Sequence, residues 1–366
     1  MNNKLNKIVI ATGGTGGHIF PAYSLAKHFF EKKINVHLIS DKRGMRYLKN
    51  CNDVNITQIA SSPILKKNIF SFSFSIIINF YSILRASIFL LFNRPDLVFG
   101  MGGYSSLPIC IAAKVLKIPF IIYENNLHIG RANKFLLPLA KKVLVSHIHL
   151  EGVDSKYKKK LSAIGNIIRK EILNFQVKNS KNYNDKKIKI LILGGSQAAR
   201  VFGEKLPQIF KKCVDSKIHL KIYQQCIPEQ NEFLSSFYKQ LNINYEIFNF
   251  SNNILEYFSK INLAITRSGS SMLAELINTK IPFISIPLPT SADNHQLKNA
   301  IYYEKNQYSY LIEEKDLDTK LFKLIKSIHE DRSLLEQITN KQKKYSDKLV
   351  YVNIDNEINK IINEKN

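Results

Sequence analysis

The sequence predicts an α/β fold in which a Rossmann-like parallel sheet is built twice. The chain has 366 residues, about two to three times the usual length of one domain. Short β-branched runs alternate with helical patterns, which is typical of βαβ units. The alternation stops near residue 165 and restarts near residue 188, after an Asn- and Lys-rich stretch at residues 178–187. We therefore expect two domains, residues 1–165 and 166–340, followed by a helical segment at residues 341–366.

The first half contains short apolar runs that indicate buried parallel strands. They lie at residues 8–11, 36–39, 96–99, 120–123 and 143–145. Residues 21–30 and 105–116, between such runs, have the apolar spacing of helices. Strands that alternate with helices in this way form a parallel sheet.

The second half repeats this pattern. Its expected strands lie at residues 188–193, 218–223, 245–248, 263–266 and 283–286. In both halves the first strand runs directly into a pair of glycines, Gly13–Gly14 and Gly194–Gly195. Two Rossmann-like domains that face each other bind a ligand in the cleft between them, at the carboxyl ends of both sheets. We expect such a cleft here.

The composition excludes several classes of protein. Hydrophobic residues make up 45% of the chain and charged residues 22%, which excludes a disordered or fibrous protein. The formal net charge is +24, but no nucleic-acid recognition motif accompanies it, so we expect no nucleic-acid partner. The four cysteines form no C-x-x-C pair. Neither a disulfide framework nor a zinc site is therefore indicated, and free thiols favour a reducing compartment.

Residues 69–92 are apolar enough to be considered as a membrane span. A helix of this length is about 36 Å long, enough to cross a bilayer. However, Arg85 lies well inside the segment, and a central arginine costs roughly 2.5–3.5 kcal/mol on insertion. We expect instead a helix that lies on an anionic membrane surface, with an exposed apolar patch and Lys66, Lys67, Arg85 and Arg94 around its rim.

A glycine-rich loop at residues 13–18, Gly-Gly-Thr-Gly-Gly-His, follows the first strand and opens a helix. Glycines allow a ligand to approach the backbone, and a helix N-terminus offers N–H groups to an anion. The spacing does not fit the G-x-G-x-x-G dinucleotide fingerprint. The loop is either a tight turn without a ligand or a sugar- or phosphate-binding loop. In the second case the helix N-terminus keeps the imidazole of His18 neutral, so it can act as a general base near pH 7.

Polar motifs also follow other strands. In the first half they are residues 100–106 (Gly-Met-Gly-Gly-Tyr-Ser-Ser) and 123–126 (Tyr-Glu-Asn-Asn). In the second half, residues 266–271 (Thr-Arg-Ser-Gly-Ser-Ser) open a helix that carries Glu275. This helix start, with Arg267 beside it, can hold a diphosphate without a metal, and Glu275 can accept hydrogen bonds from ribose hydroxyls. No Asp-x-Asp pair is present there, so we expect no metal ion and no cofactor.

The succession GGTGGHIFP, GMGGYSSLP, ENN, GN..R, LGGSQ, RSGSS..E and DNHQ..NA, from Lys7 to Ala300, resembles the MurG family of peptidoglycan glycosyltransferases. The resemblance implies a GT-B fold, with two Rossmann-like domains facing across a cleft. It also implies an inverting, metal-independent transfer of N-acetylglucosamine from UDP-GlcNAc to the 4-hydroxyl of the N-acetylmuramyl unit of lipid I (undecaprenyl-pyrophosphoryl-MurNAc-pentapeptide). The product is lipid II, and the enzyme attaches peripherally to the cytoplasmic face of the inner membrane.

The resemblance also assigns roles to residues. The catalytic candidates are His18 and Glu124. Contacts to the N-acetylglucosamine side of the donor are implied for Thr15, Gly16, Gly17 and Asn126, and to its sugar hydroxyls for Gln296. Arg169 is expected near the uracil or ribose, Ser251 at the uracil through its backbone, and Ser196 near the diphosphate. Diphosphate and ribose contacts are implied for Ser270, Ser271, Met272, Leu273, Ala274 and Glu275.

The sequence departs from the family pattern at several of these motifs. Tyr123 stands where a histidine is usual, Asn125 replaces a glutamine, Ile167 replaces a proline and Ala198 replaces a glycine. Ser270 and Ser271 also differ from the usual residues.

Three other interpretations remain open at this point. The same fold could serve a different acceptor, as in glycolipid synthases or natural-product glycosyltransferases. It could also belong to a UDP-GlcNAc epimerase, or to a nucleotide-binding protein of the membrane surface without catalysis.

Overall fold

The computed structural model describes residues 4–49, 51, 53–60, 69–175, 187–195, 198–251 and 253–364. The chain forms two compact units, Met1–Arg169 with Asp347–Asn366, and Lys170–Ser346. The last helix, α14 (Val350–Asn363), belongs to the first unit, whereas the sequence analysis treated residues 341–366 as a separate segment. Its apolar face is buried, and Asp355 on this helix pairs with His28 and Lys32 of α1.

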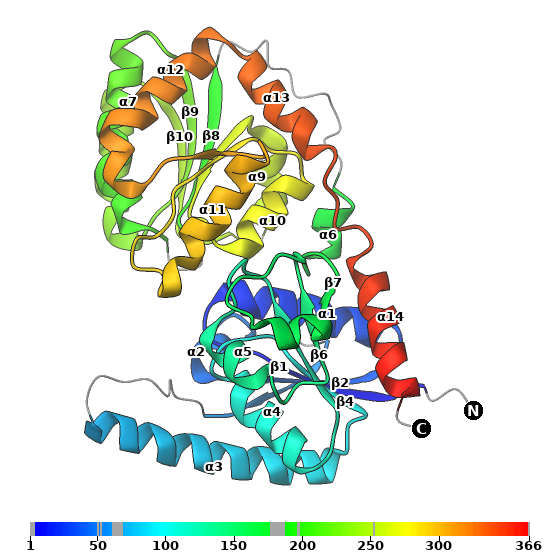
Figure 1. Cartoon of the computed structure of the whole chain (residues 1–366). Coiled ribbons are helices and arrows are strands. Elements are labelled where there is room, and N and C mark those ends of the chain that lie inside the picture. The colour runs from blue at the N-terminus through cyan, green and yellow to red at the C-terminus, as the bar shows by residue number, and fades with distance from the viewer. Residues whose placement is uncertain are drawn as a thin grey trace. The chain divides into compact units, whose positions relative to one another are not determined.

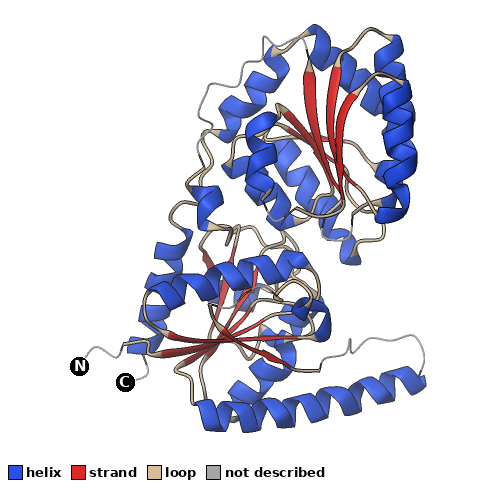
Figure 2. Cartoon of the chain, turned by 180° about the vertical axis from the view of Figure 1, so that it is seen from behind, coloured by secondary structure: helices blue, strands red, loops and turns tan. Residues whose placement is uncertain are grey.

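The first unit contains a seven-stranded sheet in the order β3-β2-β1-β4-β5-β6-β7, and all its strand pairs are parallel (Figure 1). The strands are β1 (Lys7–Ala11), β2 (Asn35–Ser40), β3 (Asn55–Gln58), β4 (Leu97–Gly100), β5 (Phe120–Glu124), β6 (Lys142–Val145) and β7 (Leu161–Ala163). The helices are α1 (Gly16–Glu31), α2 (Lys42–Met45), α3 (Ile69–Asn93), α4 (Ser106–Val115), α5 (Arg131–Leu136) and the 3₁₀ helix η1 (Ser155–Lys160). Strand β4 is buried along its whole length because helices cover both faces of the sheet (Figure 2).

The second unit contains a six-stranded parallel sheet in the order β10-β9-β8-β11-β12-β13. The strands are β8 (Ile188–Leu193), β9 (Leu220–Gln225), β10 (Asn244–Phe248), β11 (Leu263–Thr266), β12 (Phe283–Ser285) and β13 (Tyr310–Leu311). The α-helices are α6 (Lys170–Leu173), α7 (Arg200–Asp215), α8 (Asn231–Gln240), α9 (Ile254–Lys260), α10 (Ser270–Asn278), α11 (His295–Lys305), α12 (Phe322–Glu330) and α13 (Ser333–Gln342). Shorter helical turns are η2 (Pro228–Gln230), η3 (Ala292–Asn294), η4 (Glu314–Asp316) and η5 (Leu317–Leu321).

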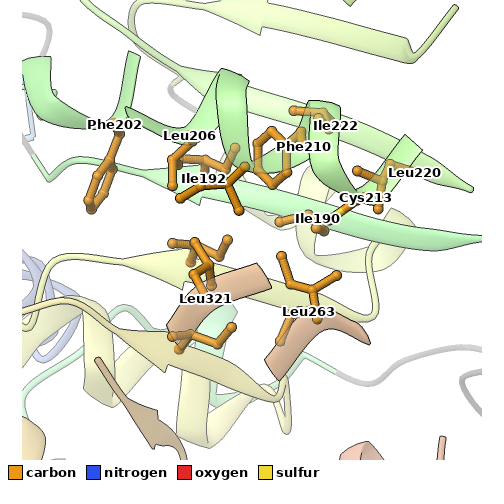
Figure 3. Close-up of a cluster of buried hydrophobic side chains, with 14 of the residues drawn as sticks. Ile190, Ile192, Phe202, Leu206, Phe210, Cys213, Leu220, Ile222, Leu263 and Leu321 are labelled. Carbon is orange, nitrogen blue, oxygen red and sulfur yellow. The ribbon is translucent and has the colours of Figure 1, made fainter. Parts of the chain in front are cut away.

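The hydrophobic core of the second unit lies between the sheet and its helices. Phe202, Leu206 and Phe210 lie at helical spacing on α7 and pack against Ile190 and Ile192 of β8 (Figure 3). This packing explains why residues 190–193 are all apolar rather than alternating with polar residues, because a central parallel strand is buried on both faces.

The two sheets share one topological feature that positions functional residues. In the first sheet, β2 and β3 are added on one side of β1, and β4 to β7 follow on its other side. In the second sheet, β9 and β10 are added on one side of β8, and β11 to β13 follow on its other side. Ligands of open α/β sheets bind at such a switch point, outside the carboxyl ends of the strands. The loops after β1, β4, β8 and β11 are the polar motifs identified in the sequence.

Helix α3 exposes more large apolar side chains than is usual for a surface helix. Figures 1 and 2 show that it lies beside α4 and that its first half extends past the rest of the first unit. Its exposed apolar residues are Ile77, Phe80, Tyr81, Leu84, Ile88, Leu91 and Phe92. Its buried face includes Ser75, Asn79 and Ser82 beside Ala86 and Leu90. Within the part of the chain that the structure describes, no helix is both long and apolar enough to cross a membrane.

Candidate functional site

The first glycine loop leads directly into α1. The helix begins at Gly16, and Thr15 occupies the N-cap position with an extended backbone. Thr15 is exposed, and its side chain does not cap the helix. A side-chain hydroxyl at the mouth of an uncapped helix N-terminus can therefore bind a sugar or an anion.

The imidazole of His18 packs against the second glycine loop, after β4. A Cβ atom placed on Gly102 would lie 3.2 Å from Cε1 of His18, and one on Gly103 would lie 3.1 Å from the carbonyl oxygen of Gly13. Both glycines have a positive φ, +83° and +75°, which any other residue adopts only with strain. The two loops therefore interlock, and glycine is required for His18 to lie where it does.

The start of α1 is also held by β5. Pro21 lies inside α1 and has no N–H to donate to the carbonyl oxygen of Gly17, one turn earlier. The side-chain amide of Asn125 donates to this oxygen instead, at 3.2 Å. Asn125 thus connects the motif at the end of β5 to the helix that carries His18.

The carboxylate of Glu124 is buried and accepts hydrogen bonds on both oxygens. Oε1 accepts from the backbone N–H and the side-chain amide of Asn126, at 3.1 and 3.0 Å. Oε2 accepts from the N–H of Gly130 at 2.8 Å and from Nδ2 of Asn133 at 2.9 Å. All these donors are neutral groups of residues 125–133. This arrangement fixes the loop after β5 and is typical of a structural carboxylate rather than a general base.

Asn133 was not identified by the sequence analysis. It is buried, and its Nδ2 also donates to the carbonyl oxygen of Tyr123 at 2.9 Å. Asn133 lies ten residues after Tyr123, on the short helix α5, and nothing in the sequence marked it as a part of this motif.

In the second unit, α10 begins at Ser270 without a side-chain cap. Glu275 on this helix is only 8% exposed, unlike an ordinary surface glutamate. Ser271 and Met272 are partly exposed, whereas the side chains of Leu273 and Ala274 are fully buried in the interior. A ligand can therefore reach the helix start, Ser271 and Met272, and Glu275 through the small part of its side chain that is exposed, but not Leu273 or Ala274.

Arg267 differs from the expectation that it supplies charge beside this helix start. Its guanidinium is buried, donates to the carbonyl oxygens of Ile286 and Pro287, pairs with Glu314 and lies over the ring of Phe202. Arg267 therefore connects the loop after β12 to η4, and its charge is already paired within the protein.

The other expected donor-binding residues are spread over several loops. Gln296, at the start of α11, accepts from the N–H of Leu288 at 3.0 Å, so it orders the loop before it. Asn299 on the same helix is buried and donates to the carbonyl oxygen of Ser268 at 3.2 Å, a link that the sequence analysis did not assign. Ser251 and Arg169 are partly exposed, and Ser196 lies outside the described residues, as do Lys66 and Lys67.

Among the described residues, no group of three or more His, Cys, Asp and Glu side chains could hold a metal ion.

Comparison with known proteins identifies the class. Residues 8–145 match the glycosyltransferase family 28 N-terminal domain, and residues 189–354 match the glycosyltransferase family 28 C-terminal domain. A crystal structure of MurG from Acinetobacter baumannii has the same fold, with a TM-score of 0.77 at 22% identity over 99% of this chain and 100% of that chain. The chain is a glycosyltransferase of the GT-B fold.

Two curated relatives narrow the assignment. One from Pelagibacter ubique is 35% identical over 98% of this chain and 99% of its own length, and one from Rickettsia bellii is 33% identical over 88% and 91%. Both are named UDP-N-acetylglucosamine–N-acetylmuramyl-(pentapeptide) pyrophosphoryl-undecaprenol N-acetylglucosamine transferase. The chain belongs to the MurG family of glycosyltransferase family 28, as its motifs indicated.

Proposed function

We propose that this enzyme transfers N-acetylglucosamine from UDP-GlcNAc to the 4-hydroxyl of the N-acetylmuramyl unit of lipid I, which forms lipid II. The observation that supports it most is the similarity to transferases of this name along nearly the whole chain, at 35% identity. This similarity spans both halves, so it favours transfer to lipid I over another acceptor, an epimerase or a protein without catalysis.

Donor binding rests on the second unit. Glu275 accepts hydrogen bonds from the ribose hydroxyls, and the uncapped start of α10 binds the diphosphate. As UDP leaves, negative charge builds on the diphosphate, and oriented N–H groups stabilise it without a metal.

The test of donor binding is the affinity for UDP. Glu275→Ala should weaken UDP binding by about 10-fold or more, because two hydrogen bonds to a charged acceptor are lost. Glu256→Ala is the matched control, since Glu256 is an exposed glutamate of α9 that pairs only with Lys260 among the ion pairs described. Equal UDP affinities of the two variants would contradict this role of Glu275.

His18 is the proposed general base. Its imidazole takes the proton of the acceptor 4-hydroxyl as that oxygen forms a bond to C1 of N-acetylglucosamine, while the bond from C1 to the UDP oxygen breaks on the opposite face. One proton moves to the imidazole and UDP carries away the electron pair, so the configuration at C1 inverts.

The corresponding test separates chemistry from binding. His18→Ala should lower kcat by about 100-fold or more with little change in donor affinity, since general-base catalysis typically contributes 10²–10⁴-fold. His28→Ala on the same helix is the control, because His28 pairs with Asp355 of α14 and not with the glycine loops. If His18→Ala instead weakens UDP-GlcNAc binding and leaves kcat unchanged at saturation, His18 only binds substrate.

We propose further that the exposed face of α3 docks on the cytoplasmic leaflet of the membrane that carries lipid I. Phe80 and Phe92 on this face are 71% and 87% exposed. Arg85 and Arg94 are exposed beside it. Several polar side chains of α3 donate to carbonyl oxygens one turn earlier in the helix, as Ser82 does to Ile78 and Ser87 does to Ile83. Apolar contact and attraction to anionic lipids together suit a peripheral enzyme with a lipid-linked acceptor.

Co-sedimentation with liposomes tests this docking. Binding should increase with anionic lipid and decrease with salt, and Arg85→Glu should weaken it, since one basic residue near the surface contributes about 1 kcal/mol. The double variant Phe80→Ser/Phe92→Ser should weaken binding more than Phe233→Ser, which changes an exposed phenylalanine of the second unit. Binding that is the same for all these variants would contradict the proposed surface.

A further inference from the structure

Asp41 follows β2 and joins three segments of the first unit through one buried carboxylate. Its Oδ1 accepts the backbone N–H groups of Gly44 at 2.8 Å and Gly14 at 3.1 Å. The hydroxyl of Ser105 also hydrogen-bonds to this carboxylate. Arg43 pairs with Oδ2 at 3.2 Å. Gly14 lies in the first glycine loop and Ser105 in the second, so one side chain holds both loops.

The carboxylate is suited to this role because it is charged. Burial alone would raise the pKa of Asp41, but the N–H groups of Gly44 and Gly14, the Ser105 hydroxyl and the Arg43 guanidinium together lower the pKa below its usual value. Hydrogen bonds to an ionised acceptor are about twice as strong as those between neutral groups. The loops are therefore attached to a firmly held acceptor at neutral pH.

The second unit uses the equivalent position in the same way. Gln225 ends β9, which lies beside β8 as β2 lies beside β1. Its Oε1 accepts the N–H of Gly194, in the glycine loop after β8, at 3.2 Å, and its Nε2 donates to the carbonyl oxygen of Asn249 at 3.3 Å. Both units thus fix the glycine loop after their first strand with a side chain from the end of the neighbouring strand.

The contacts of the loops extend to His18. A Cβ on Gly13 would lie 1.9 Å from Oγ of Ser105, and the glycines of the second loop lie against Gly13 and the imidazole of His18. If the loops separate, His18 loses the surface on which it packs.

We propose that Asp41 is a positioning residue for the transfer reaction, holding the two glycine loops together and through them the imidazole of His18. This inference rests on the proposed role of His18 as the base. Asp41 acts through the two loops and not by binding the substrate. A displacement of about 1 Å of a catalytic group can reduce the rate about 100-fold.

The chain supplies a matched control for removal of this carboxylate. Asp96 also accepts two backbone N–H groups on one oxygen, those of Asn6 at 2.8 Å and Lys7 at 2.9 Å, but at the amino end of β1, away from the glycine loops. Asp41→Ala should lower kcat about 10- to 100-fold with KM for UDP-GlcNAc within about twofold, whereas Asp96→Ala should keep kcat within about twofold. Equal effects of the two variants on kcat would overturn the proposal.

A double-mutant cycle shows whether Asp41 acts through His18. In a His18→Ala background, Asp41→Ala should lower kcat by less than about twofold further, because the group that it positions is absent. The same loss in both backgrounds overturns the proposal for Asp41 alone. An unchanged kcat of His18→Ala by itself instead overturns the role of His18 and this inference with it. If Asp41→Ala does not fold, Ser105→Ala replaces it in the same double-mutant cycle with His18→Ala. This variant leaves the carboxylate of Asp41 in place and removes its contact to the second glycine loop.

Discussion

The backbone N–H of Ile167 donates a hydrogen bond to the phenolic oxygen of Tyr123, at 3.0 Å. The Tyr123 hydroxyl donates in turn to the carbonyl oxygen of Gly165 at 3.3 Å. These are two of the positions at which the chain departs from the family pattern, where a histidine and a proline are usual. A proline at position 167 would have no N–H to donate. Ile167 has one, and it donates to the oxygen of the buried Tyr123 side chain.

This pairing predicts that the two positions are coupled in stability. Ile167→Pro removes the donor and should destabilise the protein by about 1–3 kcal/mol. In a Tyr123→Phe background the same change should cost about 1 kcal/mol less, because no hydroxyl is left without its partner. Urea unfolding of the four proteins measures the coupling. Additive free energies of unfolding would show that the two departures are independent.

Ala198 adopts a left-handed backbone conformation with φ of +47° at the position where the family has a glycine. Such a conformation costs a residue with a Cβ about 1 kcal/mol, partly offset by the greater freedom of an unfolded glycine. Ala198→Gly should therefore raise the free energy of unfolding by roughly 0.5–1 kcal/mol. Ala199→Gly is the control. Ala199 has φ of −97°, so glycine relieves no strain there and should only lower the free energy of unfolding. Thermal or chemical unfolding measures the stability of both variants. A lower stability of Ala198→Gly than of the wild type would contradict the proposed strain at Ala198.

The variant Glu124→Gln tests whether the carboxylate of Glu124 has a structural or a catalytic role. Glu124→Gln keeps one acceptor oxygen but presents an NH₂ group to N–H donors, so it should lower stability by about 1–3 kcal/mol. Its pH profile of kcat should keep the shape of the wild-type profile, because the proton acceptor is another group. Disappearance of the acidic limb of the profile in this variant would instead assign the base to Glu124.

His147 predicts a pH dependence of stability. Burial lowers the pKa of His147 from 6.5 to about 4. Below pH 6.5 the unfolded chain therefore binds a proton that the folded chain does not, so stability is lost as the pH falls from 6.5 towards 4. The loss is on the order of 3 kcal/mol at 1.36 kcal/mol per pKa unit. Between pH 6.5 and 4, the free energy of unfolding of His147→Gln should decrease less than that of the wild type, by this amount. Parallel curves of unfolding free energy against pH for the two proteins would contradict the lowered pKa of His147.

Much of the fold could be predicted because its central strands carry their own signal. Residues 188–193 and 263–266 are strands over the ranges expected, since buried parallel strands are mostly apolar on both faces. Strands β3, β7 and β13 were missed because they are short, lie at sheet edges and are at least partly exposed. Helix α1 begins at Gly16 rather than at residue 21, because a start rich in glycine with a proline inside does not look helical.

The glycine loops of the candidate site could be recognised from the sequence because their backbone conformation and close packing require glycine. Gly102 and Gly103 were recognisable because only glycine combines a positive φ with such close packing. Asp41, Asn133 and Gln225 were not, because a polar residue after a strand or on a helix looks the same whether it holds a loop or faces water. Their roles depend on partners distant in sequence, such as Gly14 for Asp41.

The most direct test of the central claim is transfer of radiolabelled N-acetylglucosamine from UDP-GlcNAc to a lipid I analogue, with EDTA present. We predict a labelled lipid product in which the new bond is to the 4-hydroxyl of the N-acetylmuramyl unit, formed at a rate that EDTA does not reduce. Absence of labelled lipid, with UDP-GlcNAc either unchanged or converted to its 2-epimer, would contradict the transfer reaction. A product that forms only with added Mg²⁺ or Mn²⁺ would contradict the stabilisation of the leaving diphosphate by the start of α10.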